Sequence, residues 1–475
     1  MKSIFTPQQY KIEDKCGIPF IDRNEIYEIL EKHKHPTTAE IDAVISRSLN
    51  KNRLSLQECA TLIGASDREN IDKIIAAAKE LKRKIYGDRI VLFAPLYVGN
   101  HCSNNCLYCG FRVTNRDLVR RTLSSTEFTS EIEALEDAGH KRLILVFGEH
   151  PTYSPEFIAE CTQKAYTIKH NGGEIRRVNI NAAPLSVEGF RTVKQAGIGT
   201  YQVFQETYDE QLYKKFHRSG KKADYNFRLT AFDRAMEAGI DDVGLGALLG
   251  LGDPFFELMA MVRHVNHLEA CYGVGAHTLS FPRIKAASGV DNSMFSEVSD
   301  EEFIRFIAIL RLAVPYTGMI LTARESSDLR REALAMGISQ IDGGTKIEIG
   351  GYSSMESQNL NREQFLINDE RSLQGVIREL TRTEYIPSFC TACYRKGRTG
   401  EHFMEFSVPG FIKRFCTPNA ILSYAEYLED YADKDLRESG YQLIDKKLNE
   451  MLPVQREELR LELEQIKKGK RDLHH

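Results

Sequence analysis

The chain has 475 residues, of which 42% are hydrophobic and 27% are charged, and its formal net charge is -4. This composition is ordinary for a globular protein that buries a large core. Because the chain carries no excess of positive charge, nucleic acid is not expected among its partners.

The first residues, MKSIFTPQQYKIEDK, lack the apolar segment of a signal peptide. The longest apolar stretch, roughly residues 90–98, is too short to cross a membrane. We therefore expect a cytoplasmic protein without a membrane partner. The ten cysteines of such a protein are more typical of metal or redox sites than of a disulfide scaffold.

In about the first 80 residues, apolar residues recur at helical spacing, and this pattern predicts helices. The segments with this pattern are NEIYEILEKH, TAEIDAVISRSL and NIDKIIAAAKELKRKIYG. Thr38 and Asp67 stand where two of these helices are expected to begin. We therefore assign residues 1–83 to a helical N-terminal extension.

From about residue 88, short apolar or β-branched runs alternate with amphipathic segments. The runs that predict strands are 89–96, 142–148, 176–183, 200–207, 242–249, 277–284, 318–324 and 339–344. Helices are expected between most of them, at 126–140, 186–197, 225–239, 257–273 and 300–315.

Eight such βα units in about 260 residues are typical of an α/β fold of the (β/α)8 TIM-type barrel. A doubly wound open sheet is the alternative, since a sequence does not show whether a sheet closes. We assign residues 84–375 to the barrel. Residues 376–475 form a C-terminal domain that is mostly helical and carries a second group of cysteines.

The first group of cysteines follows the first predicted strand directly, in the sequence HCSNNCLYCG. Cys102, Cys106 and Cys109 are spaced C-x3-C-x2-C, and barrel enzymes place their chemistry on loops at the C-terminal ends of strands. Three thiolates suit a 4Fe–4S cluster that keeps one iron without a protein ligand. Structural zinc is the alternative, but zinc prefers four ligands. His101 could supply the fourth, although its position directly before Cys102 makes it difficult for both side chains to bind one metal ion.

The second group, Cys390, Cys393 and Cys416, is spaced C-x2-C-x22-C near the C-terminus. Again three thiols predict a 4Fe–4S cluster with an open iron. Zinc completed by His402 is the alternative. The scattered cysteines are expected to be small buried hydrophobic residues. These are Cys16, Cys59, Cys161 and Cys271.

The first group resembles the motif of the radical S-adenosylmethionine superfamily, including the aromatic Tyr108 before its last cysteine. The resemblance implies that the open iron binds S-adenosylmethionine, and that reduction of the cluster then releases a 5′-deoxyadenosyl radical. It also implies that Tyr108 packs near the adenine, Glu149 binds the amino group of the methionine portion, and Glu206 lies near the ribose. Phe147 replaces the first glycine of the superfamily's Gly-Gly-Glu motif. A solvated loop residue is the alternative for Glu149.

Both cysteine spacings together resemble the HydG family, the tyrosine lyases of FeFe-hydrogenase maturation. The similarity runs from about residue 84 to 430 and includes SFCTACYRKGRTGEHFM. It implies cleavage of L-tyrosine to p-cresol and dehydroglycine. Carbon monoxide and cyanide then form from dehydroglycine and are captured at the C-terminal cluster, which carries an additional iron and cysteine. Further implied partners are a one-electron reductant, such as ferredoxin or flavodoxin, and the other hydrogenase maturases.

Two alternatives to this function stay open. A related lyase of thiazole biosynthesis stops at dehydroglycine and lacks the C-terminal cysteines. A carrier of iron–sulfur clusters would have no enzymatic activity at all. The loop DGGTKIEIGGYSS after the eighth predicted strand and the GEHP sequence at 148–151 depart from the HydG pattern. The substrate or the product could therefore differ from those of the family.

Three more residues come from the HydG resemblance. His277 begins the sixth predicted strand, at the barrel end opposite the radical chemistry, where a family histidine ligates the additional iron. Without the resemblance, the position of His277 at the beginning of a strand favours a structural histidine in the core of the barrel end. Arg324 and Thr322 end the seventh predicted strand, where related lyases have Ser-x-Arg, and a guanidinium can hold a substrate carboxylate. A solvent-facing Arg324 paired with Glu325 is the alternative.

Overall fold

The computed structural model describes residues 20–354 and 359–475 and contains a closed barrel of eight parallel strands. The barrel closes because β1 pairs with β8 on one side and with β2 on the other. The predicted barrel is therefore confirmed, and the open-sheet alternative is wrong. The strands are β1 Arg89–Gly99, β2 Arg142–Phe147, β3 Arg177–Asn181, β4 Tyr201–Glu206, β5 Val243–Ala247, β6 Thr278–Ser280, β7 Gly318–Leu321 and β8 Gln340–Asp342.

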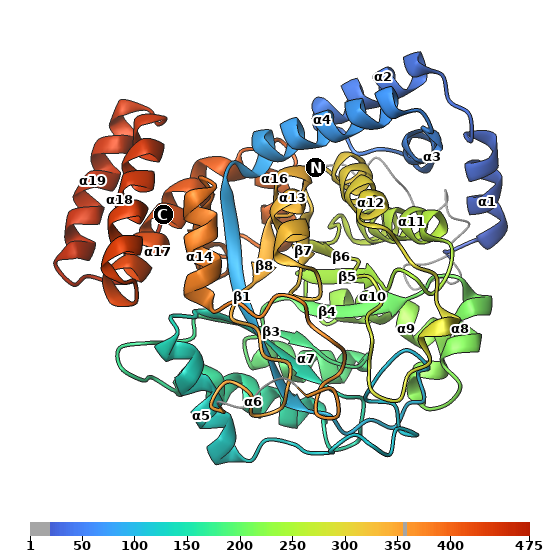
Figure 1. The fold of residues 1–475 in the computed structure, drawn as a ribbon, viewed down its shortest axis with the longest axis horizontal. Helices are drawn as coiled ribbons and strands as arrows, with labels where there is room; N and C mark the ends of the chain where they lie inside the picture. Colours follow the sequence, from blue (N-terminus) through green and yellow to red (C-terminus); the bar gives the residue numbers. More distant parts are fainter. Residues whose placement is uncertain (1–19, 355–358) are drawn as a thin grey trace.

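Helices surround the strands, as Figure 1 shows. In chain order from β1 they are α5 Ser125–Asp137, α6 Pro155–Thr167, α7 Val187–Gln195, α8 Glu210–Phe216, α9 Tyr225–Leu229, α10 Ala231–Glu237, α11 Pro254–Tyr272, α12 Asp300–Ala313 and α13 Ser327–Met336. Short 3-10 helices occupy Lys221–Ala223 and Asn292–Met294. The segment predicted as one helix at 225–239 is two helices, because the backbone leaves the helical conformation at Thr230.

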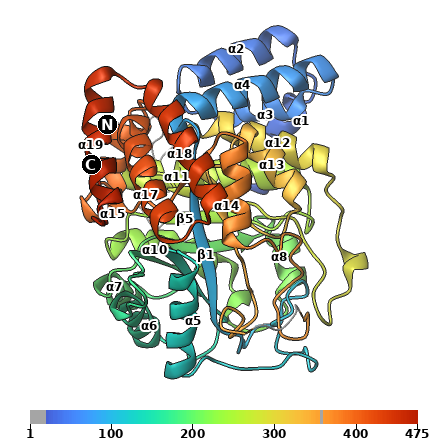
Figure 2. The same cartoon turned by 60° about the vertical axis from the view of Figure 1, so that its left-hand side comes forward.

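Four N-terminal helices pack on the outside of the barrel, against α11, α12 and α13 (Figures 1 and 2). They are α1 Arg23–Lys32, α2 Thr38–Leu49, α3 Leu56–Gly64 and α4 Arg68–Tyr86. Asp67 caps α4 as predicted, whereas Thr37 and not Thr38 caps α2, in a capping box with Glu40. The sequence pattern missed α3.

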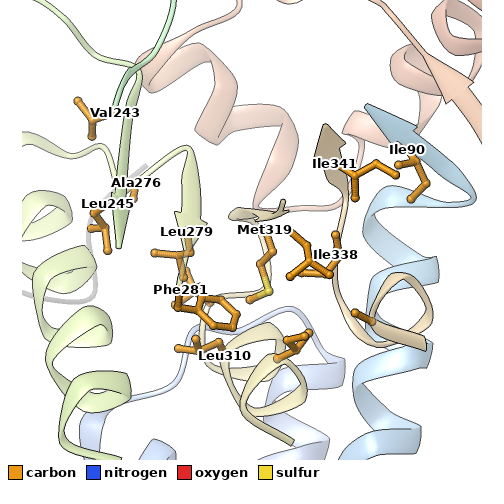
Figure 3. Packing of buried hydrophobic residues seen from close by; sticks show 14 of the residues in the cluster. Ile90, Val243, Leu245, Ala276, Leu279, Phe281, Leu310, Met319, Ile338 and Ile341 are labelled. Carbon is orange, nitrogen blue, oxygen red and sulfur yellow. The ribbon is translucent and has the colours of Figure 1, made fainter. Parts of the chain in front are cut away.

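The barrel and its outer helices share one hydrophobic core. Figure 3 shows part of it, where Leu279 and Met319 of the strands lie near Leu310 of α12, and Ile341 of β8 lies beside Ile90 of β1. Cys59, Cys161 and Cys271 are buried, which confirms the expectation for these cysteines. Cys16 and the first 15 residues lie outside the described part of the chain. Of the described helices, none is long and apolar enough to span a membrane.

A ninth strand, β9 Ile386–Ser388, was not predicted and joins the C-terminal part of the chain to the barrel. It runs parallel to the first residues of β1, on the same edge that β2 occupies further along. The flanking helices are α14 Leu373–Arg382, α15 Ala392–Arg395, α16 Gly400–Ser407, α17 Ile412–Asp430, α18 Lys434–Asn449 and α19 Pro453–Lys467. Helices α17, α18 and α19 form the red group beside α14 in Figure 1.

One lysine of α4 is buried without a polar partner. The Lys82 side chain is 1% exposed, its Nζ makes no hydrogen bond in the described structure, and it lies 4.5 Å from the centroid of the Tyr385 ring. Burial lowers the pKa of Lys82 from 10.5 to about 7. Between these pH values the unfolded chain binds a proton that the folded chain releases, so the free energy of unfolding rises with pH.

We therefore predict that Lys82→Met stabilises the protein by about 2 kcal/mol at pH 7, because the desolvated amine is removed. The gain should be larger at pH 6.5 than at pH 9.5, because the free energy that the unfolded wild type gains by protonating this amine decreases as the pH approaches 10.5. Anaerobic thermal unfolding at both pH values measures it. Lys79→Met, on the exposed face of the same helix, is the matched control. An equal gain at both pH values would contradict the burial of a titrating amine.

Candidate metal centres at the two ends of the barrel

The loop after β1 brings the first three cysteines to the C-terminal end of the barrel. Cys102, Cys106 and Cys109 all line one cavity of about 190 Å³. The loop is held in place by an isolated bridge between Cys106 and His217, which follows α8. The cysteines therefore lie at the end of the barrel where the sequence placed them. The other residues predicted for this end also line the cavity. They are Tyr108, Glu149, Glu206, Thr322 and Arg324.

Glu149 connects the end of β2 to the cysteine loop. Its Oε2 accepts a hydrogen bond of 2.8 Å from Asn104 Nδ2, and its carbonyl accepts one of 2.8 Å from Ser103 N. Gly148 comes so close to this loop that a Cβ would lie 2.1 Å from His101 O. Glycine is therefore required at 148, whereas Phe147 packs against Tyr153 and replaces the motif's first glycine without obstructing the loop.

Glu206 is a buried carboxylate held by two cations. Lys222 Nζ lies 2.6 Å from its Oε1, and Arg228 Nη2 lies 3.8 Å away. Burial alone would raise the pKa of Glu206, but Lys222 and Arg228 outweigh it and hold this pKa below its usual value. Its φ of 73° is a conformation that L-residues rarely adopt. Such strain at a buried charged residue is typical of functional sites.

The Tyr108 ring lies beside Lys222, the lysine that pairs with Glu206. It is 8% exposed, and its hydroxyl is 2.7 Å from His217 Nε2, which fixes the direction of the ring. Lys222 Nζ lies 5.5 Å from the centroid of the Tyr108 ring. Tyr108 therefore presents a fixed aromatic surface to the cavity, next to the ion pair of Glu206.

Arg324 has no carboxylate partner in the described structure. Its guanidinium carbon lies 3.3 Å from the centroid of the Phe365 ring, and the group lines the cavity beside Thr322. Glu325 instead binds Arg283 and Lys285. The alternative interpretation, an Arg324 paired with Glu325 in solvent, is therefore wrong. A stacked guanidinium in a cavity is able to receive an anionic ligand.

Several residues of this cavity were not predicted. Gln364 donates from Nε2 to Cys109 Sγ at 3.5 Å and accepts a hydrogen bond of 3.0 Å from the Tyr97 hydroxyl. Lys222 and Arg228 were also missed. Gln364 belongs to a long irregular segment after β8, and no local pattern marks it. The segment DGGTKIEIGGYSS contributes Thr345 and Ile347 to the cavity wall.

The second three cysteines lie at the opposite end of the barrel. Cys390 follows β9, Cys393 begins the turn of α15, and Cys416 belongs to α17. They line a smaller cavity of about 60 Å³, whose wall is completed by residues at the beginning of several barrel strands. A hydrogen bond between the Cys393 and Cys416 thiols lowers the pKa of Cys416 and raises that of Cys393. The two thiols thus compete for one proton.

His277 lines this second cavity and immediately precedes β6, as predicted. Its ring lies 4.4 Å from that of Phe403, and its Nδ1 lies 3.8 Å from Asp242 Oδ2. His402 is instead exposed and contacts Glu405 of its own helix, so it is not brought to the cysteines.

Two further histidines, His264 and His267, belong to α11. Both are buried. His267 Nε2 lies 2.7 Å from Asp233 Oδ1, and His264 Nδ1 lies 2.9 Å from the Tyr208 hydroxyl. These contacts stabilise the packing of α11 beside the barrel.

The donor atoms at both ends fit iron–sulfur clusters. Each end gathers three cysteines that form no disulfide, and the cysteine thiolate is the usual ligand of such clusters. Burial raises the pKa of Cys106 to about 12, so its thiolate form requires a bound cation. Among the described residues, no three Cys, His, Asp or Glu side chains are arranged around a single metal ion.

Two family models match the chain. The model of the radical SAM superfamily matches residues 96–265, which include the first three cysteines. The model of the Biotin and Thiamin Synthesis associated domain matches residues 280–386. Together they cover most of the barrel.

Individual relatives extend the similarity beyond the barrel. The chain is 30% identical to the 2-iminoacetate synthase of Salmonella typhimurium over 340 residues, which are 71% of this chain and 88% of that protein. A crystal structure of HydG, a maturase of the FeFe-hydrogenase, covers 96% of this chain and 99% of its own, with a TM-score of 0.92 and 43% identity. HydG from Carboxydothermus hydrogenoformans covers 93% and 97%, with a TM-score of 0.82 and 38% identity.

Proposed function

Because this chain belongs to the HydG family of radical S-adenosylmethionine enzymes, we propose that it cleaves L-tyrosine to p-cresol and dehydroglycine and then yields carbon monoxide and cyanide for hydrogenase maturation. The observation that carries this proposal is the pair of three-cysteine sites at opposite ends of one barrel. The first suits radical generation and the second suits capture of the products. The 2-iminoacetate synthase named above supports the first step, since 2-iminoacetate is dehydroglycine.

Cys102, Cys106 and Cys109 would hold the first 4Fe–4S cluster. With S-adenosylmethionine bound, this centre supplies the deoxyadenosyl radical. The Glu149 carboxylate, which lines the same cavity, would accept a hydrogen bond from the amino group of the cofactor's methionine portion. Glu206 stays ionised through Lys222, so it is a ready acceptor for ribose hydroxyls.

The substrate would lie across the same cavity from the cluster. Arg324 has a free guanidinium that can hold the tyrosine carboxylate in a bidentate contact, and the Phe365 ring keeps that guanidinium in one plane. Thr322 adds a hydroxyl two residues earlier on the same wall. Fixing the carboxylate would orient the amino group of tyrosine toward the radical and keep water from the reacting atoms.

Anaerobic turnover with L-tyrosine, S-adenosylmethionine and dithionite tests the proposal. We expect p-cresol, cyanide and carbon monoxide together, with carbon monoxide measured by its capture on deoxyhaemoglobin. Cys106→Ala is the control that removes the first cluster. The absence of p-cresol from the wild type would overturn the proposal.

The similarity to 2-iminoacetate synthase favours a second candidate, a tyrosine lyase that stops at dehydroglycine as in thiazole biosynthesis. That enzyme would give p-cresol and no carbon monoxide. A protein that only carries clusters would not cleave S-adenosylmethionine reductively with any amino acid. The same assay therefore separates all three functions.

Replacing Arg324 tests the substrate contact. Arg324→Gln should lower p-cresol formation by at least about tenfold, because a charge-assisted carboxylate contact is lost. Cleavage of S-adenosylmethionine without substrate should persist, since Glu149 and Glu206 are unchanged. Arg331→Gln, on the exposed side of α13, is the matched control. If Arg324→Gln lost both activities in parallel, the residue would serve the cofactor and not the substrate.

At the second end, Cys390, Cys393 and Cys416 would hold the auxiliary 4Fe–4S cluster, and His277 would ligate an additional iron. A free cysteine would complete the coordination of that iron. The His277 ring is suited to this role because it faces the same cavity as the thiols. The Asp242 Oδ2 atom lies 3.8 Å from Nδ1, which is a charge contact and not a hydrogen bond.

Variants of the second cysteine site should distinguish the ligands of the auxiliary cluster from the ligand of the additional iron. The reconstituted wild type should contain about eight irons in two 4Fe–4S clusters, and Cys390→Ala about four. Cys390→Ala should still form p-cresol but no carbon monoxide. His277→Ala should keep both clusters and lose the additional iron and its electron paramagnetic resonance signal.

His402→Ala is the matched control, because His402 is an exposed histidine of the same domain. Unchanged iron content in Cys390→Ala would refute the second cluster. Normal binding of the additional iron in His277→Ala would refute the ligand assignment.

A further inference from the structure

Two loops beside the first cysteine site carry a surplus of positive charge. Residues 112–121 and 214–222 together contain nine lysines and arginines and one acidic residue, Asp117, although the net charge of the whole chain is -4. Figure 1 shows the first loop, in blue, beside α8, the helix that leads into the second loop. The two loops are therefore strongly basic parts of an acidic chain.

Both loops are hydrogen-bonded to the segment between the first two cysteines. The Asn104 carbonyl accepts a hydrogen bond of 2.8 Å from Val113 N, and Asn104 Oδ1 accepts one of 3.0 Å from Lys222 N. Asn105 N donates to Ser219 O at 3.1 Å. The basic loops are therefore held directly against the loop that would carry the first cluster.

An exposed apolar side chain lies where the two loops meet. Val113 is 50% exposed, and its neighbour Thr114 donates from Oγ1 to Asn105 Oδ1 at 2.8 Å. The carbonyl of the same asparagine accepts a hydrogen bond from Arg218 N of the second loop. Val113 therefore lies near the cations of the second loop as well as those of its own.

Three cations of these loops are exposed and available to a partner. Arg116, Arg218 and Lys221 form no ion pair within residues 20–354 and 359–475. None of the three lines the cavity of the first cysteines, so they are not placed to hold the cofactor or the substrate. An exposed apolar residue with available charges around it is typical of a protein–protein interface.

The position of this surface indicates the class of its partner. The first cluster must receive one electron before it cleaves S-adenosylmethionine, and the cysteine loop is nearest to solvent here. We infer that residues 112–116 and 218–221 form the docking surface of a small acidic one-electron carrier protein. The carrier is oxidised by one electron, and the first cluster is reduced by it. Electron-transfer complexes are typically small and weak, and complementary charge speeds their formation.

Binding of an acidic flavodoxin to the anaerobically reconstituted protein tests this surface. The inference rests on the proposed function only in that the first cysteines hold a cluster that must be reduced. At an ionic strength of about 0.05 M, calorimetric titration should show that Arg116→Glu and Arg218→Glu each weaken binding at least about fivefold. The effect should largely vanish at about 0.5 M, because salt screens exposed charges. Lys79→Glu, the same charge change on the exposed face of α4, should bind like the wild type.

A second measurement separates docking from damage to the cluster. Reductive cleavage of S-adenosylmethionine should slow in both arginine variants when reduced flavodoxin supplies the electron, and it should keep the wild-type rate when dithionite supplies it. Their iron content should equal that of the wild type. If Arg116→Glu does not hold its iron, Lys221→Glu takes its place.

Some outcomes would overturn the inference. They are no binding of flavodoxin to the wild type, unchanged binding in every loop variant, or an equal loss in Lys79→Glu. Binding of a single-stranded RNA oligonucleotide in place of flavodoxin, with the same dependence on the arginines, would also overturn it. A wild type that forms no p-cresol but keeps the charge-dependent binding of flavodoxin would refute the proposed function and leave the docking surface standing.

Discussion

The arrangement of this molecule depends on the hydrogen bonding of one long strand. The first residues of β1 pair with β9, which leads to Cys390, and its last residues pair with β2 just before the loop of Cys102. Eleven residues at about 3.3 Å each give β1 a length of about 36 Å. A single strand therefore fixes the positions of both groups of cysteines and the separation between them.

The interior of the barrel is adapted to these two centres. The interior of a typical barrel is filled by branched apolar side chains, which make it a solid core. Here Asn181, Gln202, Ser280 and Asp342 line the cavity at one end, and Gln340 lines the cavity at the other. Glycine at 244 in β5 allows close packing of neighbouring strands, since a Cβ there would lie 2.5 Å from Thr278 Oγ1. The apolar packing that stabilises the fold lies outside the strands, between β6, β7, β8 and helices such as α12 (Figure 3).

Features that depend on short sequence patterns could be predicted from the sequence. The eight strands, the loop of the first cysteines and the position of His277 at the opposite end all follow from alternation and spacing. The strand β9 was missed because three residues are too few for a periodic signal. Lys222, Arg228 and Gln364 were missed for another reason. They act through partners distant in sequence, such as Glu206 and Cys109, and only the folded chain brings these together.

The pairing of β9 with β1 also bears on how the C-terminal part of this chain relates to the rest. Although it carries its own cysteines, it is not a removable attachment, since Arg89, Ile90 and Val91 would lose their neighbour without it. An exposed strand edge inside a barrel rim is prone to intermolecular pairing. Truncation of this chain at the junction would thus leave the first residues of β1 without a partner on that edge and disturb the barrel itself.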